Sequence, residues 1–112
     1  MITSIENAEH YVWGEACDGW HLLKSDRLSV IQECMPPGTA EQRHYHERAQ
    51  QVFYILEGRA TFEIDGQINT MERGQSVHIP PGTPHRIQNN EITDLRFLVI
   101  SEPKSHGDRI SA

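Results

Sequence analysis

Short apolar stretches that alternate with Gly and Pro turn signals constrain the fold of this chain more than any other feature of its sequence. We expect strands over residues 28–35, 51–57, 60–65, 68–72, 76–79, 85–89 and 95–101. Between two of these stretches stands Asp65-Gly66, a pair that tolerates positive φ and favours a tight hairpin. Short strands with such regular breaks are typical of a sandwich or a closed barrel. The sequence therefore predicts an all-β fold, with a meander of antiparallel strands in its middle.

The segment 40–51 is rich in Ala, Glu, Gln and Arg, so helix propensity alone would make it helical. It lacks the apolar stripe of a packed helix, however, and it carries His44 and His46 two residues apart. On a helix, side chains at i and i+2 point about 200° apart, whereas on a strand they share a face at about 6.6 Å. Two histidines that act together therefore need a strand here, with Tyr45 turned away.

The overall composition narrows the partners that the protein can have. The 112 residues fit one domain, and a net charge of -6 with lysine only at positions 24 and 104 argues against binding nucleic acid. No apolar run approaches the roughly 18 residues of a membrane span, and the N-terminus lacks the blocks of a signal peptide. We therefore expect a cytoplasmic protein with no nucleic-acid or membrane partner. The polar residues 102–112 are expected to form a tail on the surface.

The stretch 51–57 has apolar side chains on both faces. Phe53 and Ile55 share the face of Gln51, and Tyr54 and Leu56 lie on the other. A strand that is apolar on both sides needs two covers, and in a chain this short the second cover could be another subunit. Because a dimer is the commonest form of soluble oligomer, we expect a homodimer.

Cysteine and the isolated histidines allow several interpretations. Cys17 and Cys34 could form a disulfide, bind metal or remain two buried thiols, and the last is favoured because free cysteine is among the most buried residue types. His78 is more typical of a surface or interface histidine than of a catalytic one. His21 lies before the first clear strand, and the sequence leaves its role open.

His85 strengthens the case for a metal site. The pair His44 and His46 is weak evidence alone, since such pairs also occur on exposed strands without a ligand. His85 follows the stretch Pro80-Pro81-Gly82-Thr83-Pro84, in which φ is fixed at three prolines. A loop this stiff places its next side chain reproducibly, so three histidines from two separate segments could meet.

Residues 38–58 and 74–89 resemble the two sequence motifs of the cupin superfamily. The first motif reads Gly, five residues, His-x-His, three or four residues, Glu, six residues, Gly, and it is matched by Gly38, His44, His46, Gln51 and Gly58. The second reads Gly, five residues, Pro-x-Gly, two residues, His, three residues, Asn, and it is matched by Gly74, Pro80, Gly82, His85 and Asn89. Only Gln51 departs from the pattern, because the family usually has Glu there.

The resemblance implies a single cupin domain over residues 1–112, folded as an antiparallel β-barrel or jelly roll. It also implies one divalent metal bound by His44, His46, His85 and Gln51, with Phe53 and Ile55 in the cavity wall. Exchanging Glu for Gln keeps an oxygen donor but removes a negative charge, so a bound metal should be a stronger Lewis acid. Four neutral ligands disfavour hard cations and favour Zn, Fe, Ni, Cu or Co, with Mn still allowed. A cupin that has lost its metal is the alternative.

The same resemblance suggests an enzyme that acts on a small chelating organic substrate. Iron would favour dioxygenase chemistry, and zinc would favour isomerase, cyclase or lyase chemistry. The alternative is a non-catalytic cupin module that binds a small molecule or a metal as a sensor or binder. Gln51 cannot act as a general base, so proton transfer would have to involve the substrate, a bound water or a side chain that the sequence does not reveal.

Overall fold

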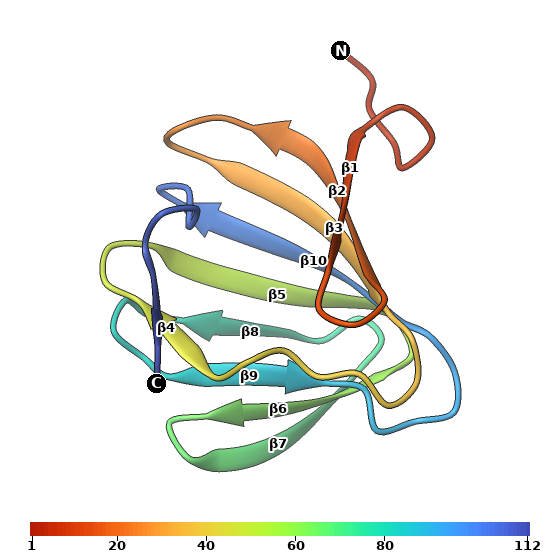
Figure 1. Ribbon diagram of the computed structural model, residues 1–112, viewed down its shortest axis with the longest axis vertical. Helices are drawn as coiled ribbons and strands as arrows, with labels where there is room; N and C mark the ends of the chain where they lie inside the picture. The colour runs from red at the N-terminus through yellow and green to blue at the C-terminus, as the bar shows by residue number, and fades with distance from the viewer.

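The computed structural model describes residues 1–112, which form eleven strands and no helix. The strands are β1 (Glu9–Trp13), β2 (Cys17–Lys24), β3 (Ser29–Met35), β4 (His44–His46), β5 (Gln50–Glu57), β6 (Arg59–Ile64), β7 (Gln67–Glu72), β8 (Ser76–Ile79), β9 (His85–Gln88), β10 (Leu95–Glu102) and β11 (Arg109–Ser111). They build two antiparallel sheets, ordered β1-β2-β3-β10-β5-β8 and β11-β4-β9-β6-β7 (Figure 1). The predicted all-β fold is confirmed, and the two-sheet arrangement is of jelly-roll type. No helix long and apolar enough to cross a membrane is present.

Each of the seven expected strands is present within one residue of its expected bounds. The histidine segment is extended as β4, so the helix that propensity alone suggested does not form. Strands β1 and β2 were not expected. Their sequences mix polar, aromatic and glycine residues without a clean alternation, and their pairing with each other and with β3 creates the edge of the larger sheet.

The meander expected in the middle of the chain is wrong, because consecutive strands mostly change sheets. Between β5 and β6 stands only Gly58, whose φ of 87° turns the chain from the six-stranded sheet into the five-stranded one. By contrast, Asp65 and Gly66 have φ of 50° and 84° and close the expected hairpin between β6 and β7. The hairpin signal was thus interpreted correctly, whereas a one-residue corner had no distinct signal.

The C-terminal residues 102–112 are not merely the polar surface tail that we expected. They contain β11, which pairs with β4, with Arg109 opposite His46 and Ser111 opposite His44. In Figure 1 this segment is the dark blue strap that runs along β4 to the C-terminus. The pairing of β11 with β4 uses backbone groups, which every sequence has. The polar composition of residues 102–112 therefore gave no sign of this strand.

Aromatic residues join the core to the histidine strands. The Phe53 ring lies 4.8 Å from Phe62 and 5.9 Å from Phe97, measured between centroids, and 5.9 Å from the His85 ring. The apolar core therefore lies directly against one wall of the histidine cluster.

Cys17 and Cys34 are buried and unpaired, which confirms the prediction of two buried thiols.

The outer face of β5 is incompletely covered within the chain. Val52 and Leu56 are half-buried there, and Tyr54 is 39% exposed. The homodimer that we expected from this strand stays a prediction.

The corner at Gly58 should tolerate no side chain. A Cβ there would meet the Asp94 carbonyl oxygen at 2.5 Å, whereas a Cβ at Gly66, at nearly the same φ, would meet nothing within 4 Å. We expect Gly66→Ala to cost only positive-φ strain, about 1 kcal/mol of unfolding free energy. Gly58→Ala adds a backbone clash and should cost about 2–4 kcal/mol. Urea unfolding followed by tryptophan fluorescence measures both, and equal losses would contradict the corner argument.

Candidate metal centre

Strands β4 and β9 bring the three predicted histidines together. His44 and His46 occupy alternate positions of β4 and share a face, and His44 lies opposite His85 in the pairing of β4 with β9. One ring nitrogen of each histidine lies within 4.8 Å of those of the other two. All three residues are buried. The spacing argument from the sequence thus led to a real cluster in space.

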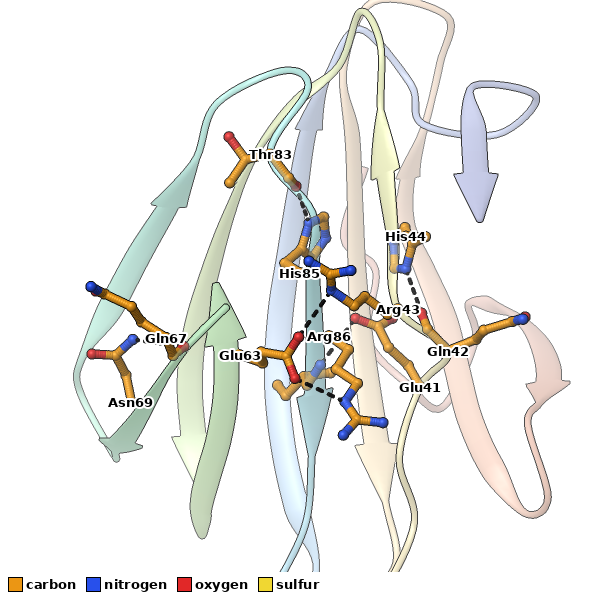
Figure 2. Close-up of polar contacts among 11 residues, drawn as sticks. Glu41, Gln42, Arg43, His44, Glu63, Gln67, Asn69, Thr83, His85 and Arg86 are labelled. Atoms are coloured by element: carbon orange, nitrogen blue, oxygen red, sulfur yellow. Dashed lines mark hydrogen bonds and ion pairs between the residues drawn. The ribbon is translucent and has the colours of Figure 1, made fainter. Parts of the chain in front are cut away.

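Backbone carbonyls fix the tautomer of each ring. The Nδ1 atoms of His44, His46 and His85 lie 2.7, 3.2 and 2.8 Å from the carbonyl oxygens of Gln42, Asp108 and Thr83. Figure 2 shows two of these contacts, those of His44 and His85. A carbonyl oxygen can only accept a hydrogen bond, so each Nδ1 carries the proton and each neutral ring keeps its lone pair on Nε2.

Burial keeps the rings neutral. It lowers the pKa of His44 to about 3 and also lowers the pKa values of His46 and His85, although the Nδ1 contacts partly oppose the shift. The Nε2 atoms of His46 and His85 are buried and have no hydrogen-bond partner. Buried polar atoms without partners are rare and unfavourable, and a neutral imidazole with a free Nε2 is the form that binds metal.

Gln51 offers a further unpartnered donor atom. It lies on β5 opposite Ser101 of β10, and its Nε2 donates to the Ser101 hydroxyl at 3.0 Å. This contact turns the amide so that Oε1 is buried and has no partner. Three imidazoles together with this amide oxygen would make a donor set without charge, and such a set would fit a transition metal better than a hard cation.

A cavity of about 310 Å³ opens beside these donors. His44, His46 and Gln51 line it, as does Phe53, which we expected in its wall. Ile55, the other expected wall residue, is fully buried in the hydrophobic core. The cavity is large enough for a small organic molecule at the lower end of the usual ligand-site range.

Asp108 ties the C-terminal strap to the histidine strand. Its carboxylate accepts the backbone N–H groups of Glu47, Arg48 and Ala49 at 3.1, 2.9 and 2.9 Å, and its carbonyl faces the ring of His46. Burial alone would raise the pKa of Asp108, but these N–H donors together hold it below its usual value. Sequence analysis missed Asp108, because its partners are backbone groups that leave no pattern.

Sequence reasoning also missed four polar residues of the cavity wall: Tyr11, Glu33, Glu41 and Arg109. The Tyr11 hydroxyl donates to Glu33 Oε2 at 2.9 Å, and Ile87 N–H donates to Glu41 Oε1 at 3.2 Å. One signal could have revealed Glu33. It shares the inward face of β3 with Ile31, where alternation calls for an apolar residue.

Both carboxyl groups hold their protons unusually tightly. Burial raises the pKa of Glu33 to about 7, against the lowering effects of the Tyr11 hydroxyl and the Arg109 charge. Burial raises the pKa of Glu41 to about 8, and the charge of Glu33 adds to that rise. Perturbed carboxyl groups in a cavity are characteristic of functional sites.

The remaining histidines of interest lie outside the triad. His78 is exposed and contacts Gln50 Oε1 through Nε2 at 3.0 Å, as expected of a surface histidine. His21 is buried with an unpartnered Nδ1, and its ring lies 5.7 Å from that of His106, which lines the cavity.

Comparison with known families agrees with this geometry. The cupin domain profile matches residues 31–101, which is more than half of the chain. The chain belongs to the cupin family. Members of this family typically bind a metal, and the histidine triad could hold one.

Individual proteins are also similar to the chain in sequence or in fold. It is 33% identical over 89 residues to an uncharacterized protein of Methanocaldococcus jannaschii, covering 79% of this chain and 71% of that protein. It is 33% identical over 66 residues to an oxalate-binding protein of Thermotoga maritima, covering 59% of this chain and 54% of that protein. The structure of the polyketide cyclase RemF from Streptomyces resistomycificus matches with a TM-score of 0.84 at 18% identity, over 100% of this chain and 86% of that one. Cupin relatives therefore include a protein that binds a small oxygen-rich ligand.

Removing the Asp108 carboxylate should loosen the strap. Asp108→Ala leaves three backbone N–H groups without their acceptor, one of them on the buried Ala49, and we expect a loss of about 1–3 kcal/mol in unfolding free energy. Asp26→Ala is the matched control, because the Asp26 side chain makes only an exposed ion pair with Lys104, and its removal should leave the unfolding free energy unchanged within measurement error. Urea unfolding compares the two, and a loss for Asp108→Ala no larger than that of the control would refute the role of the strap.

The raised pKa values of Glu33 and Glu41 predict a pH dependence of stability. The folded chain holds these protons more tightly than the unfolded chain, whose carboxyl pKa is about 4.5. The stabilisation is therefore complete below about pH 4.5 and is lost as the pH rises through about 8. In metal-free protein, the Tm of the wild type should fall between pH 5 and 9 relative to a Glu33→Gln/Glu41→Gln variant. A Tm difference that is constant with pH would contradict the raised pKa values.

Proposed function

We propose that this cupin is a metal-dependent enzyme that acts on a small organic molecule through two chelating oxygens. One observation carries the proposal: the Nε2 atoms of His46 and His85 and the Oε1 atom of Gln51 are buried without a hydrogen-bond partner. His46 and Gln51 line the same cavity, and His85 belongs to the histidine cluster with His46. Each of these atoms gives up its contact with water on folding and regains no hydrogen bond. A divalent metal among them would compensate for this loss.

The residues fit a transition metal with open coordination positions. His44, His46 and His85 would supply imidazole nitrogens and Gln51 an amide oxygen, which suits Zn, Fe, Ni, Co or Cu and allows Mn. When bound, the metal would polarise the substrate oxygens as a Lewis acid. The chain's own contribution is to hold the three rings in one tautomer through their Nδ1 contacts.

The rest of the cavity favours proton-transfer chemistry over oxygenation. Apolar side chains such as Phe53 and Val99 exclude water from one side, and Arg109 adds a positive charge that suits anionic substrate oxygens. Glu33 and Glu41 can exchange protons near neutral pH. Isomerase, cyclase and lyase reactions need such groups, and the fold shared with the polyketide cyclase RemF is consistent with them.

A binding module is the second candidate. The similarity to an oxalate-binding protein, over 54% of that protein's length, favours a cavity that holds a small dicarboxylate without turnover. The cytoplasmic location and the homodimer remain predictions in either case, because they rest on the sequence alone.

Removal of a metal-coordinating side chain should weaken metal binding. We expect His46→Ala and His85→Ala to lower zinc affinity by at least about 100-fold, since each removes one of four donors. Gln51→Glu should retain the metal, because it keeps an oxygen donor at the same place. Tyr45→Phe is the control, since Tyr45 alternates with the two β4 ligands and should leave occupancy unchanged. Metal content after dialysis is measured by mass spectrometry, and full occupancy in His85→Ala would refute the assignment.

The choice between enzyme and binder needs ligand tests on the loaded protein. Samples loaded with zinc or iron are incubated with oxalate, pyruvate and pentane-2,4-dione and followed by NMR and calorimetry. Consumption or exchange of a ligand supports the enzyme, and saturable binding without change supports the binder. Absence of any rise in Tm with Zn, Fe, Ni, Mn or Co would eliminate both versions.

A further inference from the structure

Two carboxyl groups face the cavity from different sheets. Glu33 lies on β3 in the six-stranded sheet, and Glu41 runs alongside β9 of the five-stranded sheet, where its N–H donates to the carbonyl of Ile87. His46 and Gln51 line the same cavity, are more than nine-tenths buried and have unpartnered Nε2 and Oε1 atoms. The two acids and these two unpartnered donor atoms thus share one cavity.

Glu33 is held by a contact that spans a whole strand. Tyr11 of β1 lies opposite Gly19 of β2, and Gly19 lies opposite Glu33 of β3. The Tyr11 ring crosses over Gly19 and brings its hydroxyl to 2.9 Å from Glu33 Oε2. A Cβ at position 19 would lie 2.6 Å from the Tyr11 hydroxyl oxygen, so only glycine leaves room for this crossing. The arrangement orients one carboxyl group of the cavity.

The two carboxyl groups have different surroundings, and these surroundings favour ionisation of one group over the other. Glu33 receives the Tyr11 hydroxyl, which stabilises its ionised form, and Arg109 acts on it in the same direction. Glu41 receives one backbone N–H and also senses Arg109, but the charge of Glu33 opposes its ionisation. The Tyr11 hydrogen bond therefore favours ionisation of Glu33 before that of Glu41, so the pair offers one carboxylate and one carboxylic acid in the same cavity.

We propose that Glu33 is the catalytic acid–base residue of this cavity, positioned by Tyr11, and that the substrate class is an enolisable oxygen chelate such as a 2-oxo acid. This inference rests on the proposed function, because it assumes that the substrate oxygens face the histidines. The Glu33 carboxylate takes a proton from the carbon next to the carbonyl group. The C–H electron pair becomes the carbon–carbon double bond of the enolate, and the charge moves to oxygen. Glu41 keeps its proton and donates a hydrogen bond to that oxygen.

The reverse step completes the exchange without any oxidant. Glu33, now protonated, returns a proton to the same carbon or to a neighbouring one, and the double-bond electrons form the new C–H bond. In deuterated water, the proton on Glu33 is replaced by deuterium before it is returned, so the substrate acquires the label. Exchange at carbon is therefore a direct readout of this residue.

The test uses the zinc-loaded full chain with pyruvate in deuterated water, and proton NMR follows loss of the methyl signal. We expect the wild type to accelerate exchange over the metal-free protein. Glu33→Gln should slow it at least about 100-fold with zinc content unchanged, because no base remains. Glu41→Gln should slow it by at most about 10-fold, since an amide still donates a hydrogen bond. Glu72→Gln, on an exposed position of β7, is the control and should leave the rate unchanged.

The role of Tyr11 is tested by measuring the exchange rate as a function of pH. If Tyr11 had only a structural role, its substitution would not shift this pH dependence. Tyr11→Phe removes the hydrogen bond to the carboxylate, and Gly19→Ala displaces the ring, so both should move the base limb to higher pH and restore the rate there. The matched control is Tyr45→Phe. In metal-free protein labelled with ¹³C at the glutamate carboxyl groups, the pKa of Glu33 should rise in both variants, a readout that needs neither metal nor activity.

Each outcome decides a separate point. If Glu33→Gln binds zinc and exchanges pyruvate as fast as the wild type, the inference is overturned and the metal site stands. Zinc-loaded wild type that does not accelerate exchange overturns the substrate class. A wild type that binds no metal overturns the proposed function, while the carboxyl titration still tests the Tyr11 contact. If Glu33→Gln does not fold, the pH dependence of exchange by Tyr11→Phe tests the inference instead. A loss of rate that is equal at every pH would then contradict the role of Glu33.

Discussion

The hydrogen bonds from three imidazole Nδ1 atoms to backbone carbonyls are the interaction on which the rest of the site depends. Two of the acceptors, Gln42 and Thr83, lie two residues before the histidines that they fix, so local chain geometry provides them. The third is Asp108, which lies 62 residues from His46. If any of these bonds were absent, the ring could rotate or change tautomer, and its lone pair would no longer be fixed toward the other donors.

This division between local and distant contacts explains what the sequence could predict. His44, His46 and His85 were found because alternation on a strand and a stiff proline loop are local properties that spacing records. The strap around Asp108 was not found, because its partners are backbone N–H groups, which every residue has. The corner at Gly58 was likewise ambiguous, because only the clash with Asp94 distinguishes it from a hairpin glycine.

The half of the cavity formed by β1 to β3 could be inferred only from three-dimensional pairing. Tyr11 and Glu33 are 22 residues apart, and their contact requires both strand registers and the absence of a side chain at Gly19. The local sequence of β1 does not predict a strand, because it begins with a charged residue and has no regular apolar alternation. The residues that specify the proposed chemistry are therefore the ones whose positions depend most on the complete fold.

Burial acts on the bases and the acids of the cavity in opposite directions, and this gives the site its electrostatic character. It lowers the pKa of His44 and raises the pKa values of Glu33 and Glu41, so both kinds of group tend toward their neutral forms. A dipositive ion among neutral donors would favour the ionised forms of both acids, since no carboxylate ligand reduces its charge. Because Glu33 is the easier of the two to ionise, it would release its proton first. Glutamine at position 51 would thereby couple metal occupancy to the availability of a base elsewhere in the cavity.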